Sequence, residues 1–96
     1  MGAVTDADPH RLLQRQARAL GDPTRYRIFR YVAEAGRPVS VAEITAHVEL
    51  HHNGVRQHLA KLCDASLLVE EFSARAGRGR PALQYRLDPS AARFSL

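Results

Sequence analysis

Apolar residues recur every three or four positions through two consecutive segments, 10–20 (HRLLQRQARAL) and 22–36 (DPTRYRIFRYVAEAG). This spacing places the apolar side chains on one face of an α-helix. The second segment begins with Asp22, a residue type that caps helix N-termini, and has Pro23 at the first helical position, where a missing N–H is harmless. Gly36 suits the left-handed residue that ends many helices. The pattern therefore predicts two successive helices.

A third helix is predicted from a capping box at 40–43 (SVAE). In such a box the Ser40 hydroxyl accepts a hydrogen bond from the N–H of Glu43, and the Glu43 carboxylate accepts one from the N–H of Ser40. We expect this helix to run to about His47 and to follow no more than an edge-strand fragment at 37–40. The side chains expected on its buried side are Val41, Ile44 and Val48.

The fourth helical segment, about 52–65, separates an apolar side from a polar side. Steps of about 100° per residue put Val55, Leu59 and Leu62 in one narrow sector, which we expect to face the core. The residues that point away from it or lie at its margin are Asn53, Arg56, Gln57, Ala60 and Lys61. Asn, Gln and Arg can make paired hydrogen bonds to base edges in the DNA major groove. A merely solvent-facing polar side is the alternative interpretation.

The last third of the chain changes to a strand pattern. The segment 66–73 (SLLVEEFS) is rich in Leu, Val and Phe, and 82–87 (ALQYRL) alternates apolar and polar residues. Between them a polar, glycine-containing stretch carries Arg75, Arg78 and Arg80 with no acidic residue. We therefore predict a β-hairpin with a basic tip.

The positive charge of the chain is local. The 96 residues carry a formal net charge of +4, are 45% hydrophobic and 25% charged, and fit one soluble globular domain. Residues 1–50 hold seven arginines against six acids, whereas residues 51–96 hold seven basic residues against four acids. An excess around the polar helix and the hairpin is typical of a nucleic-acid face, because phosphate contacts supply most non-specific affinity. A solvated charged loop is the alternative.

The sequence gives little support to membrane, metal or catalytic roles. No apolar run approaches the about 18 residues of a membrane helix, and the N-terminus does not resemble a signal peptide, so we expect a cytoplasmic protein. Cys63 is the single cysteine, and a turn interrupts the pair His47 and His51. Glu70 and Glu71 are adjacent on a strand and so point to opposite faces. We expect no catalytic site, no metal site and no cofactor.

A short helix, a polar-faced helix and a basic hairpin together predict a winged helix-turn-helix, mainly α with a small β-hairpin. ALGDPTRYRIFRYV (19–32) resembles the opening of the ArsR-type (arsenic-repressor-like) regulators. VAEITAHVELHHNGVRQHLAKLCDASLLVEE (41–71) is similar to their helix-turn-helix segment. GRGRPALQYRL (77–87) most closely resembles the wing of a large bacterial subgroup, GRGRPxxxYRL in pattern. The cysteine pair of arsenite-responsive members is absent.

The resemblance spans about residues 17–88 and implies a transcriptional regulator that binds double-stranded DNA, usually as a homodimer. It implies a supporting helix at 40–48, a recognition helix from about 52 to 65 and a wing at 67–87. We expect the DNA-binding residues to be His52, Asn53, Arg56, Gln57, Lys61, Arg75, Arg78 and Arg80. The helix would read bases, with Lys61 nearer a phosphate, and the wing would hold the backbone or minor groove.

Three positions depart from the family pattern. Glu49 and Ser66 stand where the family usually has Gly, so both are expected to need a left-handed backbone. His51 and His52 replace a usual Ser-Pro pair, which predicts a weakened N-cap and places two imidazoles near the groove.

Several alternatives stay open at this stage. Residues 10–88 are the expected DNA-binding domain, after a flexible 1–9 and before a tail at 89–96. The chain would be either a short regulator or the DNA-binding part of a longer iron–sulfur or ligand-sensing one. A winged-helix protein-interaction module and double-stranded RNA binding are the rival functions. The expected dimer surface is the first helix, through Leu12, Leu13, Gln16 and Leu20, unless these residues pack on their own domain.

Overall fold

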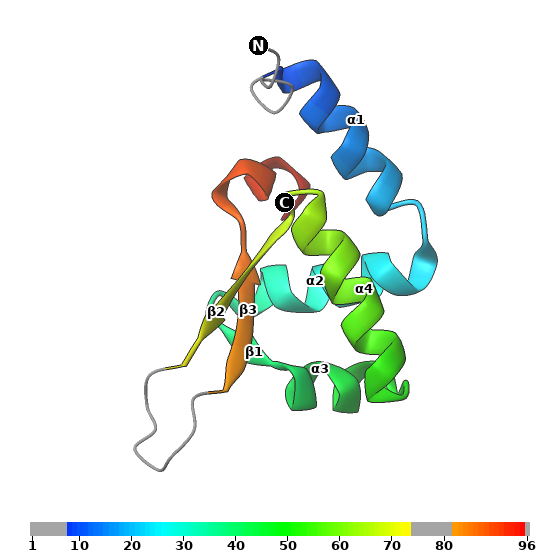
Figure 1. The fold of residues 1–96 in the computed structure, drawn as a ribbon, viewed down its shortest axis with the longest axis vertical. Helices are drawn as coiled ribbons and strands as arrows, with labels where there is room; N and C mark the ends of the chain where they lie inside the picture. Colours follow the sequence, from blue (N-terminus) through cyan, green and yellow to red (C-terminus); the bar gives the residue numbers. More distant parts are fainter. Residues whose placement is uncertain (1–7, 74–81, 96) are drawn as a thin grey trace.

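The computed structural model describes residues 8–73 and 82–95, and it contains helices with a small antiparallel sheet (Figure 1). In chain order the elements are α1 (Pro9–Ala19), α2 (Pro23–Ala35), β1 (Val39–Ser40), α3 (Val41–Val48), α4 (His52–Asp64), β2 (Leu68–Phe72), β3 (Leu83–Leu87) and the 3-10 helix η2 (Pro89–Ser95). The predicted fold class, a winged helix-turn-helix, is confirmed.

The predicted helix ends are confirmed. The Asp22 carboxylate accepts from the N–H groups of Thr24 and Arg25, at 2.9 and 3.0 Å. The hydrogen bond from the Arg25 N–H is the main reason that the pKa of Asp22 is lowered. Gly36 ends α2 with φ 66°, a left-handed conformation.

The capping box before α3 forms as predicted. The Glu43 N–H donates to the Ser40 hydroxyl at 3.1 Å, and the Ser40 N–H donates to the Glu43 carboxylate at 2.9 Å. A hydrogen-bonded ion pair with Arg37 is the main reason that the pKa of Glu43 is lowered. The ionised carboxylate therefore fixes the first turn of the helix that supports α4.

The sheet has the strand order β1-β3-β2, and both pairings are antiparallel. The fragment β1 lies at one edge, as predicted, with Val39 opposite Tyr85. Figure 1 shows the strands on one side of the helices, with the Phe72–Leu83 end of the β2–β3 hairpin pointing to the same end of the molecule as α3.

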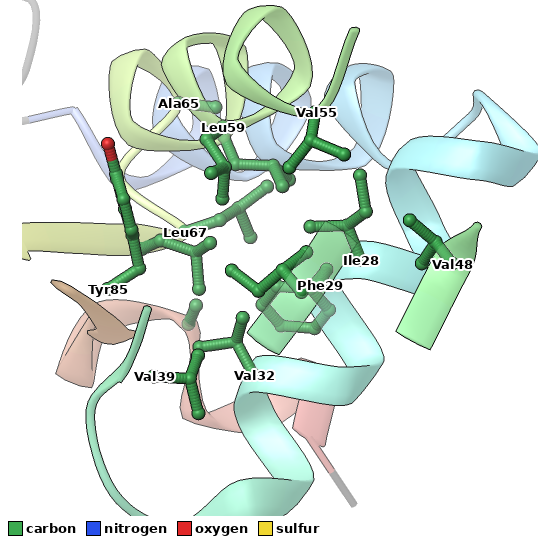
Figure 2. Packing of buried hydrophobic residues seen from close by; sticks show 14 residues of the cluster. Ile28, Phe29, Val32, Val39, Val48, Val55, Leu59, Ala65, Leu67 and Tyr85 are labelled. Carbon is green, nitrogen blue, oxygen red and sulfur yellow. The ribbon is translucent and has the colours of Figure 1, made fainter. Parts of the chain in front are cut away.

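The core lies between α2, α3, α4 and the sheet (Figure 2). Ile28 and Phe29 of α2 are 0% exposed and point toward Val55 and Leu59 of α4. The predicted core residues Val55, Leu59, Leu62, Ile44 and Val48 are all buried, whereas Val41 is half-buried. Burial of this kind is the main stabilising contribution in a domain of this size.

The two ends of the described chain differ from the expectations. Gln16 is 0% exposed, so of the two alternatives for this residue it packs on its own domain, whereas Leu13 of the same helix is 37% exposed. The Gln16 amide N–H donates to the Ser66 carbonyl at 3.1 Å and to the Ser90 hydroxyl at 3.3 Å. After Asp88, where no element was predicted, η2 places Ala91 in the core at 0% exposure.

Candidate nucleic-acid interface

The polar side of α4 is open to solvent, as predicted. Five of the predicted DNA-binding residues are exposed along it: His52, Asn53, Arg56, Gln57 and Lys61. On the opposite side Val55, Leu59 and Leu62 are each 0% exposed and hold the helix against the core. The polar side can therefore enter a groove of a nucleic acid while the apolar side stays packed.

The N-terminal end of α4 is capped by a histidine. The Nδ1 atom of His51 accepts a hydrogen bond from the Asn53 N–H at 3.1 Å. The His51 and His52 rings stack, with their centroids 4.6 Å apart. A weakened N-cap was expected because Ser is absent from this position. The imidazole nitrogen of His51 nevertheless accepts a hydrogen bond from a backbone N–H that a Ser hydroxyl would otherwise satisfy.

The turn between α3 and α4 contains the predicted left-handed residue. Glu49 has φ 56°, and its N–H donates to the Thr45 carbonyl at 2.9 Å. A side chain in this region of backbone conformation is strained, because Cβ approaches the backbone carbonyl. The turn sets the direction from which α4 leaves α3, so the strain lies in the element that orients the candidate recognition helix.

The C-terminal end of α4 forms a Schellman motif around the second predicted left-handed residue, Ser66, which has φ 60°. The Ser66 N–H donates to the Cys63 carbonyl at 3.0 Å, and the Leu67 N–H donates to the Leu62 carbonyl at 2.9 Å. Leu62 and Leu67 are both 0% exposed. This motif redirects the chain from α4 into β2 and fixes where the hairpin begins.

A groove of about 540 Å³ runs between α3 and α4. The residues that line it are Val41, Ala42, Thr45, Ala46, His52 and Arg56. Its wall on α3 is mostly apolar, and Arg56 brings a positive charge to the α4 side. The Thr45 hydroxyl oxygen is buried without a hydrogen-bond partner among the described residues. The groove therefore pairs an apolar surface with a guanidinium donor.

Both carboxylates of the hairpin stem have side-chain partners. Glu70 accepts from the Tyr85 hydroxyl at 2.6 Å, and Glu71 pairs with Arg86 at 2.8 Å, so the two acids face opposite sides as predicted. Burial, followed by the bond to Glu70, raises the pKa of Tyr85. The predicted wing arginines lie outside the described residues: Arg75, Arg78 and Arg80.

A protein-family model described as a helix-turn-helix domain matches residues 20–71, more than half of the chain. The protein belongs to the helix-turn-helix domain family. The matched segment contains α3, the turn at Glu49 and the whole of α4. The family and the fold together make this helix-turn-helix protein a DNA-binding transcription regulator.

Solved structures give the same architecture. Rv0081 of M. tuberculosis is 26% identical with a TM-score of 0.67, and the match covers 88% of this chain and 79% of that one. HlyU of Vibrio cholerae is 18% identical with a TM-score of 0.69, covering 96% and 89%. Mb0332 of Mycobacterium bovis, described as a possible ArsR-family regulator, is 20% identical with a TM-score of 0.72, covering 99% and 83%. No curated protein sequence matches significantly.

A second group of basic residues was missed by the sequence analysis. Arg15, Arg18, Arg25 and Lys61 line a cavity between α1, α2 and α4. The signal was present, because residues 9–33 contain six arginines and a single acid, Asp22. Counting charge over residues 1–50 concealed it, since the remaining acids of that half lie outside this stretch.

His47 and Cys63 have structural surroundings. His47 stacks on Tyr31 with ring centroids 4.3 Å apart. Burial raises the pKa of the Cys63 thiol to about 11. Within residues 8–73 and 82–95, no group of three or more His, Cys, Asp or Glu side chains could hold a metal ion. In the same residues no helix is both long enough and apolar enough to cross a membrane.

Proposed function

We propose that this helix-turn-helix protein reads the sequence of double-stranded DNA with α4 in the major groove. The observation that carries the proposal is the exposed polar side of α4, opposite an apolar side that is fully buried. An α-helix fits the major groove, where Arg pairs with guanine and Asn or Gln pairs with adenine. The base-reading residues we propose are His52, Asn53, Arg56 and Gln57, with Lys61 at a phosphate.

The groove between α3 and α4 supports a preference for a particular base beside the base that Arg56 reads. Ala42 and Ala46 offer an apolar surface beside the guanidinium. The methyl group of thymine is the apolar feature of the major groove, and alanine is among the side chains that contact it. We therefore propose that Arg56 reads a guanine whose neighbour is a thymine.

We propose that the hairpin acts as a wing and that Arg75, Arg78 and Arg80 at its tip hold the DNA backbone or minor groove. The support from the described stem is electrostatic. Arg86 offsets the charge of Glu71 through an ion pair, and the neutral Tyr85 hydroxyl holds Glu70 through a hydrogen bond. Cations that contact phosphates release counterions and make binding salt-dependent.

We propose an ArsR-type regulator that binds DNA as a homodimer, with residues 10–88 as its DNA-binding domain. The sequence resemblance supports the family, and the similar domain of Mb0332 is homodimeric. On α1 the exposed residues Leu13 and Ala17 form the surface that remains available once Gln16 is packed inside. Two-fold symmetry in the protein would require a palindromic operator.

The polar composition of α4 favours DNA over a protein partner. Among the described residues the exposed large hydrophobic side chains are Leu13, Tyr26, Leu50 and Phe72, and none of them lies on α4. A protein-binding surface would need apolar or aromatic residues at its centre.

The test is selection of binding sites from a pool of random duplex DNA, followed by affinity measurements with Arg56→Ala. We expect an enriched palindromic motif, and a loss of roughly 1–3 kcal/mol with relaxed preference at one base pair. Arg27→Ala, an exposed arginine of α2, is the control with the same charge change and should keep the preference. An equal loss on every sequence would make Arg56 a phosphate contact, and retention without any motif would refute sequence reading.

A further inference from the structure

A basic cavity of about 280 Å³ lies between α1, α2 and α4. The residues that line it are Arg15, Arg18, Ala19, Arg25, Lys61, Asp64 and Ala65. Four cations therefore surround one carboxylate. They come from three helices that are distant in the sequence, so the fold, and no single charged segment, brings them together.

Two of the guanidinium groups are held in place by backbone carbonyls. Arg15 of α1 donates to the carbonyl of Asp64 at the end of α4. Arg25 of α2 donates through Nη1 to the carbonyl of Ala19 at 3.0 Å. The Nε of Arg25 is buried and has no hydrogen-bond partner among the described residues. One wall of the cavity therefore holds a fixed cation.

The other two cations form no ion pair within the described residues. Arg18 and Lys61 are exposed, and within residues 8–73 and 82–95 no carboxylate lies within ion-pair distance of either, or of Arg25. Like charges gathered around a concavity repel one another, and a bound anion relieves that repulsion.

Helix electrostatics explains only part of this arrangement. Arg18 and Lys61 lie in the last turns of α1 and α4, where cations are favoured by the helix dipole. Arg25 lies in the first turn of α2, where the dipole disfavours a cation. The neighbouring Asp22 carboxylate offsets part of this cost, and Arg25 lines the cavity together with the other cations.

The cavity flanks the proposed DNA-reading face. Arg56 borders the apolar groove, whereas Lys61 borders the basic cavity. The two residues are five positions apart in the sequence, which places them about 140° apart around the helix. The exposed side of α4 thus lies between the two. When such a helix occupies the major groove, the phosphate backbones run along its flanks.

We propose that this cavity is a binding site for phosphate groups. The phosphate groups belong either to the backbone of bound DNA or to a free small polyphosphate anion. The first possibility rests on the proposed function, and the second does not. Guanidinium groups bind phosphate oxygens through paired, charge-assisted hydrogen bonds.

The experiment compares the full chain with Arg18→Gln/Lys61→Gln, which removes two exposed cations from the cavity. Arg11→Gln/Arg27→Gln is the matched control, because it removes the same charge from exposed positions of α1 and α2 outside the cavity. Titration with inorganic tripolyphosphate is followed by calorimetry and by NMR of the arginine Nε–H groups. Binding to a duplex is measured as a function of salt concentration.

A free-anion site predicts tripolyphosphate binding that shifts the Arg25 Nε–H resonance and weakens about tenfold or more in the cavity variant alone. A backbone site predicts that the salt-dependence slope falls by about two units in the cavity variant and less in the control. A fall of only about one unit, which Lys61 alone would give as a phosphate contact of α4, would contradict the backbone version. The proposal would be overturned if the cavity variant and the control changed tripolyphosphate binding and the salt-dependence slope equally. It would also be overturned if the cavity variant changed neither quantity. Failure of the wild-type chain to bind any duplex would refute the proposed function while the tripolyphosphate titration still decides this site.

Discussion

Glu49 and Ser66 hold left-handed backbone conformations at the two ends of α4, with φ 56° and 60°. Both were predicted from the sequence because they occupy positions where similar regulators have Gly. The conformation is imposed by the turn into α4 and by the Schellman motif after it, and neither residue type is suited to it. At this scale the sequence was informative because backbone geometry depends on a few neighbouring residues.

Replacing these residues by glycine should stabilise the fold. Glu49→Gly and Ser66→Gly each remove the steric strain, and part of the gain is offset by the greater freedom of Gly in the unfolded chain, so we expect up to about 1 kcal/mol per site. Urea unfolding measures the change. Gly36→Ala, which adds a side chain at φ 66°, is the control and should destabilise. A loss of stability at Glu49 and Ser66 would show that the side chains themselves contribute contacts that outweigh the strain.

Cys63 should react slowly in the folded protein. Burial, followed by nearby carboxylates, raises the pKa of its thiol to about 11, so little thiolate is present at pH 8. Because the folded pKa is the higher one, the stabilising contribution is complete below the unfolded pKa and is lost as pH rises toward 11. A disulfide reagent at pH 8 should label the native chain far more slowly than the urea-unfolded chain. Equal rates would contradict the buried environment.

The sequence was least informative about how each helix contacts distant parts of the chain. Gln16 was a candidate for a dimer surface on α1, with packing on its own domain as the alternative. It is buried and bonded to Ser66 and Ser90, which are 50 and 74 residues away. Periodicity reports the face of a helix but not its distant partners. The helix η2 was missed for the same reason, since Ala91 is buried by contacts with elements far along the chain.

Gln16 should therefore anchor α1 to the domain. Gln16→Ala removes its bond to the Ser66 carbonyl and leaves a gap, so we expect a loss of about 1–3 kcal/mol in unfolding free energy and faster hydrogen exchange in α1. Gln14→Ala, on the exposed side of the same helix, is the control and should change stability by less than about 0.5 kcal/mol. Equal effects of the two substitutions would refute the anchor.

The whole molecule presents α4 between an apolar groove and a basic cavity. The fold and the exposed face of α4 could be predicted, because caps, periodicity and the order of elements are local signals. The basic cavity could not, because Arg15, Arg25 and Lys61 meet only when α1, α2 and α4 pack together. Local patterns thus located the candidate reading helix, and tertiary packing determined what surrounds it.

The most direct test of the account is an NMR titration of the isotope-labelled chain with a duplex selected by the protein. We expect the largest amide shifts in residues 52–61 of α4, with smaller shifts in α3 and in the hairpin, and no comparable change around the exposed Glu34 at the far end of α2. Large shifts confined to surfaces away from α4, with residues 52–61 unchanged, would contradict the central claim that this helix reads the DNA.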